Sequence, residues 1–239
     1  MTYSYENQVV VVTGGTGALG RAVTEAFVKA DATVFVSYII PEEVALLKNR
    51  LVPNQNKVTI IESNLVKEES VRGLVETVLH QSSRIDVLAN VVGGYAGGPA
   101  IHETKEKDFD FMLNLNLRSA FLISKAVLPS MIEHKRGKIV HIASRTGLKG
   151  EATVGPYSIS KGGVIRLTET IAEEVMGYGI NCNCLMPSVI DTEANRKAMP
   201  DADFSKWIKP EEIAQVLLFL CSEDARIING AAIPVYGQS

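Results

Sequence analysis

Short runs of apolar, β-branched residues alternate along the chain with longer stretches in which apolar residues recur every three or four positions. The short runs predict strands and the longer stretches predict amphipathic helices. Strands are expected at residues 9–13, 33–37, 57–61, 85–92, 137–144, 180–186 and 230–237. Helices are expected at 19–30, from Pro41 onward, and at 67–83, 105–133, 156–177 and 210–220, whereas 193–209 are polar and irregular.

This alternation predicts an α/β fold, a doubly wound parallel sheet (Rossmann fold) of about seven strands with helices on both faces. No linker rich in proline, glycine or serine divides the chain, so residues 1–239 are expected to form one domain with a short lid near 193–209. Ligands of such sheets bind outside the carboxyl ends of the strands. Functional residues are therefore expected just after Thr13, Ser37, Val92, Ser144 and Met186.

Composition narrows the choice of partner. The net charge is only −3 and the basic residues are scattered, which excludes the clustered basic stripe of a nucleic-acid-binding protein. The apolar runs are shorter than the ~20 residues that a membrane span needs, and the polar N-terminus does not resemble a signal peptide. Three cysteines cannot all pair, and neither they nor the histidines have metal-ligand spacing. We expect a cytoplasmic protein with reduced thiols, no metal and a small-molecule partner.

The sequence TGGTGALG, residues 13–20, lies between the first strand and the first helix. Its glycines allow a tight turn, and the helix that follows directs free amides and its positive dipole end at an anion. An ordinary glycine turn is the alternative, but the order strand, loop, helix favours a nucleotide phosphate. The candidate contacts are Gly14, Gly15, Thr16, Gly17, Ala18 and Leu19.

The end of the second strand bears on the choice of cofactor. An acid at this position usually binds the ribose hydroxyls of NAD. Here the position is Ser37, followed by Tyr38, so the expected acid is absent and no arginine follows to bind a 2′-phosphate. Ser37 is small enough to admit that phosphate. The sequence therefore predicts NAD(P)(H), with a slight preference for NADP.

A tyrosine and a lysine, Tyr157 and Lys161, lie four residues apart on the helix that follows the fifth strand. An ammonium near a phenol typically lowers its pKa by roughly 1–3 units, which would let Tyr157 exchange a proton near neutrality. Ser144, where that strand ends, could bond the same substrate oxygen. A solvated helix face and a helix cap are the alternatives, and the spacing alone does not decide between them.

Taken together, these motifs resemble the short-chain dehydrogenase/reductase family over essentially the whole chain. The matching segments are the glycine loop, NVVGG, LNLNL, Ser144, YSISK, MPSVIDT and GAAIPVYG. The resemblance implies an NAD(P)-dependent oxidoreductase that transfers hydride reversibly between nicotinamide and a carbonyl or alcohol substrate. It also implies a homotetramer or homodimer, paired through the long helix and the tyrosine helix. There, Phe121, Val127, Ile165 and Ile171 fit either an interface or the core.

The resemblance also implies roles. Tyr157 would be the catalytic acid/base, Lys161 would lower its pKa and bind the nicotinamide ribose, Ser144 would orient the substrate oxygen, and Asn116 would hold a relay water. Cofactor contacts are implied at Asn64, Leu65, Asn90, Val92, Gly93, Pro187, Ile190 and Thr192. Substrate contacts are suggested at Tyr95, Arg145, Ser188 and Trp207, with a surface charge the alternative for Arg145 and lid packing for Trp207.

Two departures and two alternatives qualify this interpretation. Ala18 replaces a family glycine, and Asn64 stands where an aspartate is usual. Residues 93–98 and 195–207 resemble the quinonoid dihydropteridine reductases, but those enzymes lack the serine and carry the acid after the second strand. Shared ancestry with a different substrate is therefore favoured. A cofactor-sensing regulator without catalysis is the other alternative, and the complete set Asn116, Ser144, Tyr157 and Lys161 argues against it.

Overall fold

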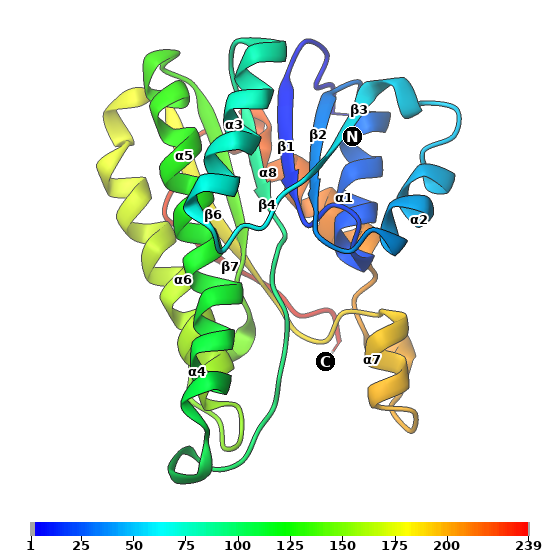
Figure 1. The fold of residues 1–239 in the computed structure, drawn as a ribbon, viewed down its shortest axis with the longest axis vertical. Coiled ribbons are helices and arrows are strands. Elements are labelled where there is room, and N and C mark those ends of the chain that lie inside the picture. Colours follow the sequence, from blue (N-terminus) through cyan, green and yellow to red (C-terminus); the bar gives the residue numbers. More distant parts are fainter. Residues whose placement is uncertain (1–2, 239) are drawn as a thin grey trace.

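A computed structural model describes residues 3–238. Seven parallel strands form one sheet in the order β3-β2-β1-β4-β5-β6-β7 (Figure 1). The strands are β1 (Val9–Thr13), β2 (Thr33–Tyr38), β3 (Val58–Glu62), β4 (Val87–Asn90), β5 (Gly137–Ile142), β6 (Ile180–Pro187) and β7 (Ala232–Val235). The predicted doubly wound sheet is confirmed.

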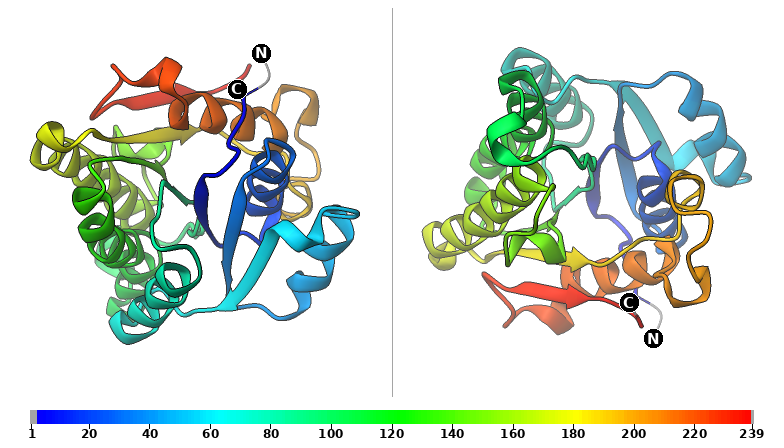
Figure 2. Two further views of the ribbon diagram at one scale, coloured as in Figure 1. Left: turned by 90° about the horizontal axis from the view of Figure 1, so that it is seen from above. Right: turned by 90° about the horizontal axis from the view of Figure 1, so that it is seen from below.

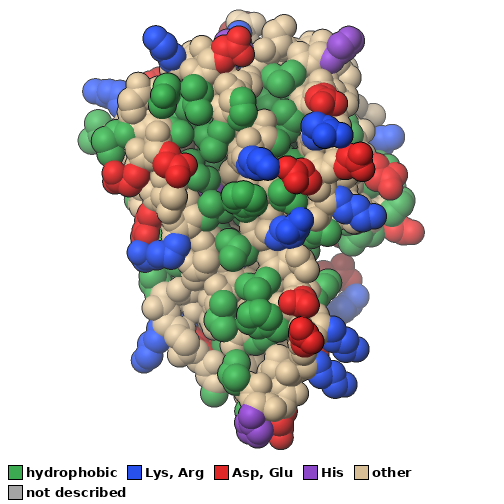
Figure 3. All heavy atoms as spheres, turned by 60° about the vertical axis from the view of Figure 1, so that its left-hand side comes forward, with side chains coloured by type: hydrophobic (Ala, Val, Ile, Leu, Met, Phe, Trp, Pro, Cys, Tyr) green, Lys and Arg blue, Asp and Glu red, His purple; other side chains and the backbone are tan. Residues whose placement is uncertain are grey.

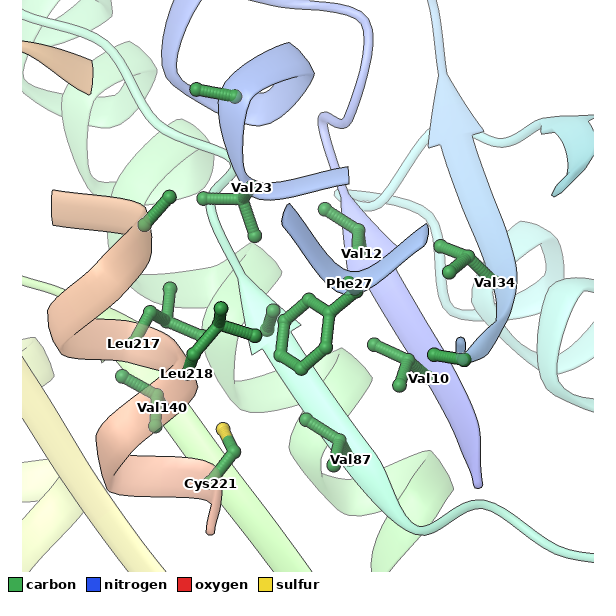
Figure 4. Packing of buried hydrophobic residues seen from close by; sticks show 14 of the residues in the cluster. Val10, Val12, Val23, Phe27, Val34, Val87, Val140, Leu217, Leu218 and Cys221 are labelled. Carbon is green, nitrogen blue, oxygen red and sulfur yellow. The ribbon is translucent and has the colours of Figure 1, made fainter. Parts of the chain in front are cut away.

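Helices cover both faces of the sheet (Figure 2). They are α1 (Ala18–Lys29), α2 (Glu42–Arg50), α3 (Glu68–Ser82), α4 (Glu106–Met112), α5 (Ser119–Glu133), α6 (Gly155–Glu174), α7 (Glu193–Ala198) and α8 (Pro210–Cys221). Val10 and Val12 pack into the cluster under α1 and α8, where Phe27 and Leu217 also lie (Figure 4). Val9 and Val11 pack into the cluster under α3 and α5 on the other face. The central strands β1 and β4 are mostly apolar because both of their faces are buried, whereas the edge strands β3 and β7 are only partly buried.

The chain reverses direction across the sheet between β1 and β4. It builds β2 and β3 on one side of β1, then returns to place β4 on the other side. The loops that leave the carboxyl ends of β1 and β4 therefore diverge and leave a crevice between them. Helices α4 and α7 extend beyond this edge of the sheet (Figure 1).

Three segments differ from the predicted pattern. The helix predicted at 105–133 consists of α4 and α5 joined by a π-helical segment, Leu113–Arg118. Residues 193–209, predicted as irregular, contain α7 and a short 3-10 turn at Phe204–Lys206, because a helix of six residues is too short to show a periodic pattern. Strands β4 and β5 end at Asn90 and Ile142, where the backbone turns into the loops of the crevice.

The segment Glu106–Glu133 is long and apolar enough to cross a membrane by length and composition alone. The prediction that every apolar stretch is too short therefore does not hold for this helix. The rest of the fold buries 44% of its most apolar part, and core helices of soluble proteins meet the same criterion.

Candidate functional site

A cavity of about 390 Å³ opens in the crevice between β1 and β4. The glycine loop, the end of β2, the loops after β3 and β4, and the π-helical segment all contribute to its walls. Eleven of the residues predicted to bind cofactor line it: Gly14, Thr16, Gly17, Ala18, Leu19, Ser37, Tyr38, Asn64, Leu65, Val92 and Gly93. A dinucleotide site predicted from the sequence thus coincides with an open space of suitable size.

The glycine loop can accept a pyrophosphate. Gly14 has a φ of +60°, a conformation that favours glycine. A Cβ on Gly20 would lie 2.0 Å from the carbonyl oxygen of Gly14, so the loop and helix α1 meet without room for a side chain. Helix α1 has no side-chain cap at Gly17 and no acid in its first turn, which leaves its first amides available to an anion.

Gly15, also predicted to contact the cofactor, does not line the cavity. A Cβ at this position would lie 2.7 Å from the Val36 side chain and 2.8 Å from that of Thr24. The residue therefore faces the junction of β2 and α1 and serves their close packing.

The end of β2 supports the loop and carries a neighbour that the sequence analysis missed. The Ser37 hydroxyl accepts a hydrogen bond from the Gly14 amide at 3.2 Å. Glu43, in the first turn of α2, lines the cavity, and its Oε2 accepts a hydrogen bond from the Thr16 hydroxyl at 2.9 Å. The end of β2 lacks an acid, as the sequence indicates, but the first turn of α2 brings one to the same cavity. The available signal was an acid in the first turn of the helix that directly follows β2.

Asn90 braces the sheet behind the cavity. Its Oδ1 accepts a hydrogen bond from the Thr13 hydroxyl at 2.6 Å, and its Nδ2 lies 3.0 Å from Nδ1 of His141. Strands β1, β4 and β5 are thereby linked. His141 is fully buried, and burial lowers its pKa to about 4, so the ring is neutral and structural, in agreement with the sequence analysis.

The four predicted catalytic residues come from three elements and converge at one end of the cavity. Tyr157 and Lys161 lie on α6, Ser144 follows β5, and Asn116 lies in the π-helical segment. The Ser144 hydroxyl lies near the Tyr157 phenol; its oxygen is 3.0 Å from Oγ1 of Thr146 and accepts a hydrogen bond from the Thr146 amide at 3.3 Å. The Lys161 ammonium is buried and donates to the Ile142 carbonyl oxygen at 2.8 Å.

Asn116 connects this group to the loop after β4. Its Nδ2 donates to the Gly94 carbonyl at 3.1 Å and to the Ser160 hydroxyl at 3.0 Å, while its Oδ1 accepts from the Gly94 amide at 2.9 Å. A Cβ on Gly93 would lie 2.8 Å from Oδ1 of Asn116 and 3.0 Å from Nζ of Lys161. Gly93 also lines the cavity, so the predicted catalytic residues lie next to the predicted cofactor-binding residues.

The ionisation of Tyr157 differs from the sequence-based expectation. Burial raises the pKa of its phenol, and the nearby Ser144 hydroxyl offsets only part of that effect. The Lys161 Nζ lies 6.0 Å from the centre of the tyrosine ring, and burial lowers the pKa of this ammonium to about 8. Spacing placed the pair on one helix face but could not show that Lys161 is buried and Tyr157 partly buried. At neutral pH Tyr157 is a protonated phenol.

The candidate substrate residues lie in different surroundings. Tyr95 is 65% exposed and meets the Tyr157 ring edge-on, with centroids 4.9 Å apart. Arg145 is exposed and lies over the Tyr236 ring at 5.5 Å, and the Ser188 hydroxyl donates to the Tyr236 carbonyl at 2.8 Å. Tyr95 is thus the candidate that touches the catalytic group.

The predicted contacts beyond β6 lie in the lid and outside the cavity walls. Trp207 is buried against Phe204, with ring centroids 4.8 Å apart, which supports lid packing. Thr192 caps α7 by accepting a hydrogen bond from the Asn195 amide. Ile190 forms a β-bridge with Ile208, and Pro187 is buried at the end of β6. The predicted cofactor contacts of Pro187, Ile190 and Thr192 and the predicted substrate contact of Trp207 stay predictions.

Metal-binding and thiol chemistry have little basis within residues 3–238. In this range no three or more His, Cys, Asp or Glu side chains are grouped so that they could hold a metal ion. Cys182, Cys184 and Cys221 are buried and free, and burial raises the pKa of each thiol.

Comparison with known proteins gives a consistent result. The sequence profile described as short chain dehydrogenase matches residues 8–203. The 3-oxoacyl-[acyl-carrier-protein] reductase FabG of Thermotoga maritima is 32% identical, with 97% of each chain covered. The (2S)-[(R)-hydroxy(phenyl)methyl]succinyl-CoA dehydrogenase subunit BbsD of Thauera aromatica is 31% identical, covering 97% of this chain and 96% of that one. The solved structure of ElxO with NADP bound superposes with a TM-score of 0.90 at 27% identity, covering 96% of this chain and 97% of that one.

Proposed function

Because this chain belongs to the short-chain dehydrogenase family and is an NAD(P)-dependent oxidoreductase, we propose that it reduces the carbonyl group of a small molecule, reversibly, to an alcohol. One observation carries the proposal. The Ser144 hydroxyl lies beside the Tyr157 phenol at the end of the cavity where Gly93 meets Asn116 and Lys161. A hydroxyl pair in this position can receive a carbonyl oxygen.

The bound cofactor supplies the hydride, and the residues of this chain supply the proton and the geometry. Tyr157, protonated at neutral pH, donates its phenolic proton to the substrate oxygen as negative charge develops there. Ser144 donates a hydrogen bond to the same oxygen and fixes its direction. Proton transfer of this kind contributes roughly 10²–10⁴-fold to a rate, and holding the reactants in contact contributes more. The raised pKa of Tyr157 suits reduction, the direction that consumes a proton.

Lys161 and Asn116 support the tyrosine from the interior. The Ile142 carbonyl oxygen holds the Lys161 ammonium in place beside Tyr157. The positive charge of the ammonium stabilises the phenolate that proton transfer leaves on Tyr157. Asn116 holds the Gly94 backbone through two hydrogen bonds and so fixes the loop between cofactor and substrate. We propose that after each turnover Lys161 gives a proton to the Tyr157 phenolate and takes up a replacement proton from solvent, while Asn116 keeps the loop in place.

The cofactor site is proposed to admit NADPH as well as NADH. The small side chain of Ser37 leaves room for a 2′-phosphate, and the NADP bound to the structural relative ElxO supports the preference for NADP predicted from the sequence. The carboxylate of Glu43 acts against that preference.

We propose that the protein is a homo-oligomer, a tetramer or a dimer, that pairs through the face formed by α5 and α6. Apolar side chains gather on this face (Figure 3). Phe121 is 48% exposed at two adjoining hollows, which Leu117, Leu128 and Leu167 also line. Of the four residues predicted to lie at an interface or in the core, the other three, Val127, Ile165 and Ile171, are buried. The predicted cytoplasmic location stays a prediction.

The test of the proposed function is the substitution Tyr157→Phe. Wild type is first screened for NADPH and NADH oxidation against a panel of ketones, aldehydes and β-keto thioesters. The variant should bind cofactor with unchanged affinity, measured by titration calorimetry, and lose at least a hundredfold in kcat with the best substrate, within the contribution expected of a general acid, ~10²–10⁴. Tyr178→Phe removes a hydroxyl from an exposed tyrosine beyond the end of α6 and should change neither quantity. Full turnover by Tyr157→Phe would contradict the proposal.

The two alternatives receive less support. The regulator requires cofactor binding alone, yet the structure gathers two neighbouring hydroxyls, Ser144 and Tyr157, and a buried lysine beside the cavity. The quinonoid dihydropteridine reductase alternative stays a prediction from residues 93–98 and 195–207. NADH oxidation with a quinonoid dihydropterin tests it, and no rate above background would remove it.

A further inference from the structure

We propose that Glu43 determines cofactor selectivity: its carboxylate accepts hydrogen bonds from the adenosine ribose hydroxyls and repels a 2′-phosphate. The inference rests on the NAD(P)H site proposed above. It assigns to the first turn of α2 the task that an acid at the end of the second strand performs in many sheets of this type.

The carboxylate has a fixed position. Thr16 is only 2% exposed, and its hydroxyl donates to Oε2 of Glu43 at 2.9 Å. Thr16 belongs to the glycine loop and lines the same cavity. Glu43 is therefore tied to the phosphate-binding loop itself, although it comes from a different element.

The position lies at the ribose end of the site. Three residues separate β2 from α2, so the first turn of α2 stays at the carboxyl end of β2. Ser37, Tyr38, Ile39, Ile40 and Glu43 all line the cavity. Ser37 occupies the usual position of the acid, and its hydroxyl already accepts a hydrogen bond from the Gly14 amide. Glu43 is thus the carboxylate available to the ribose.

The charge at this end is negative. Among the described residues that line the cavity, Glu43 is the only one with a charged side chain. Arg21, on α1, donates from Nη1 to the Thr16 carbonyl oxygen at 2.6 Å and is not part of the cavity wall. A 2′-phosphate would bring up to two further negative charges beside a carboxylate without an opposing cation in the wall.

The expected effect is large enough to measure. Like charges separated by a few ångströms near a protein surface repel strongly, with partial screening by salt. We expect Glu43 to change the ratio of NADPH to NADH affinity by on the order of tenfold. The carboxylate of Glu43 affects the ratio in two ways. It weakens the binding of NADPH by repelling the 2′-phosphate, and it strengthens the binding of NADH by accepting hydrogen bonds from the free ribose hydroxyls.

Titration calorimetry with NADH and with NADPH tests the inference on the full chain. Glu43→Gln keeps an oxygen that can accept from Thr16 but removes the charge. It should bind NADPH at least five- to tenfold more tightly than wild type and NADH equally or less tightly. Glu42→Gln removes the same charge from the adjacent exposed residue, which does not line the cavity, and should leave the affinity ratio unchanged.

A second measurement varies the salt concentration. In wild type the affinity for NADPH relative to NADH should rise with added salt, because salt screens the repulsion, and this rise should disappear in Glu43→Gln. An unchanged ratio in Glu43→Gln, or an equal shift in Glu42→Gln, would overturn the inference and leave the proposed function intact. Wild type that binds neither cofactor would overturn both.

Discussion

The buried ammonium of Lys161 lowers the stability of the fold but supports catalysis. Replacing Lys161 by methionine should therefore make the protein more stable and less active. The side chain is 4% exposed and its ammonium donates to a single carbonyl oxygen, that of Ile142. Methionine has a similar length and no charge. Lys161→Met therefore removes the ammonium without leaving a large void.

The magnitude follows from the shift in pKa. Burial lowers the pKa of Lys161 from 10.5 to about 8, and each unit corresponds to ~1.4 kcal/mol, so holding the ammonium in the fold costs about 3 kcal/mol at neutral pH. The variant also loses the hydrogen bond to Ile142, worth about 1 kcal/mol. The net expectation is a stabilisation of about 2 kcal/mol, or a Tm about 4–8 °C higher for a chain of this size.

The stability difference between wild type and Lys161→Met should depend on pH. Since the folded state lowers the pKa of this lysine, the penalty is fully present below about pH 8 and is removed as pH rises toward 10.5. Wild type should therefore approach the stability of Lys161→Met across that window. Urea unfolding at pH 7, 8.5 and 10 measures the difference, and a coupled assay with the best carbonyl substrate measures activity, which should fall at least a hundredfold in the range expected for general-acid support, ~10²–10⁴.

Lys48→Met, at an exposed site on α2, is the matched control and should change neither stability nor turnover appreciably. A Lys161→Met variant less stable than wild type at pH 7 would refute the reasoning, because it would show that the ammonium stabilises the fold. So would a stability difference that stays constant from pH 7 to 10.

Three further outcomes are expected. Between pH 7 and 5, the free energy of unfolding of wild type should fall by about 2 kcal/mol more than that of His141→Gln, as measured by urea unfolding. The reason is that the pKa of His141 is about 4 in the folded state and 6.5 in the unfolded state, so the unfolded state binds the proton first as the pH falls. Gly20→Ala should abolish calorimetric NADH binding and destabilise the fold because its Cβ would lie 2.0 Å from a carbonyl oxygen, whereas Gly73→Ala, in open space on α3, should stabilise it by about 0.5–1 kcal/mol. Phe121→Glu should shift light scattering toward a smaller assembly than Leu46→Glu, which places the same charge on exposed α2.

The sequence predicted the parts of this site that depend on strand ends. A continuous apolar run marks a strand buried on both faces, and the residues after such runs meet at one edge. Thr13, Ser37 and Ser144 were found in this way. Tyr157 and Lys161 needed only helical spacing to be placed on one face.

What the sequence did not predict depends on depth and on contacts between elements. Helical spacing put Lys161 near Tyr157, but burial, which spacing does not reveal, controls both pKa values. Glu43 was missed because its hydrogen bond to Thr16 joins residues 27 positions apart, on elements whose relative placement is set by the fold. Both corrections alter chemistry, while the fold itself stands as predicted.

Asn116 shows why one irregularity of the backbone matters for function. Periodicity predicts an unbroken helix over residues 105–133, whereas the structure widens it into π-helix at Leu113–Arg118. Such widened turns often occur at functional sites because they re-aim side chains relative to a regular helix. Here the side-chain amide of Asn116, in the widened turn, forms hydrogen bonds with Gly94 in the loop after β4 and with Ser160 on α6. The loop beside the cofactor and the helix that carries Tyr157 and Lys161 are thereby held by the same side chain.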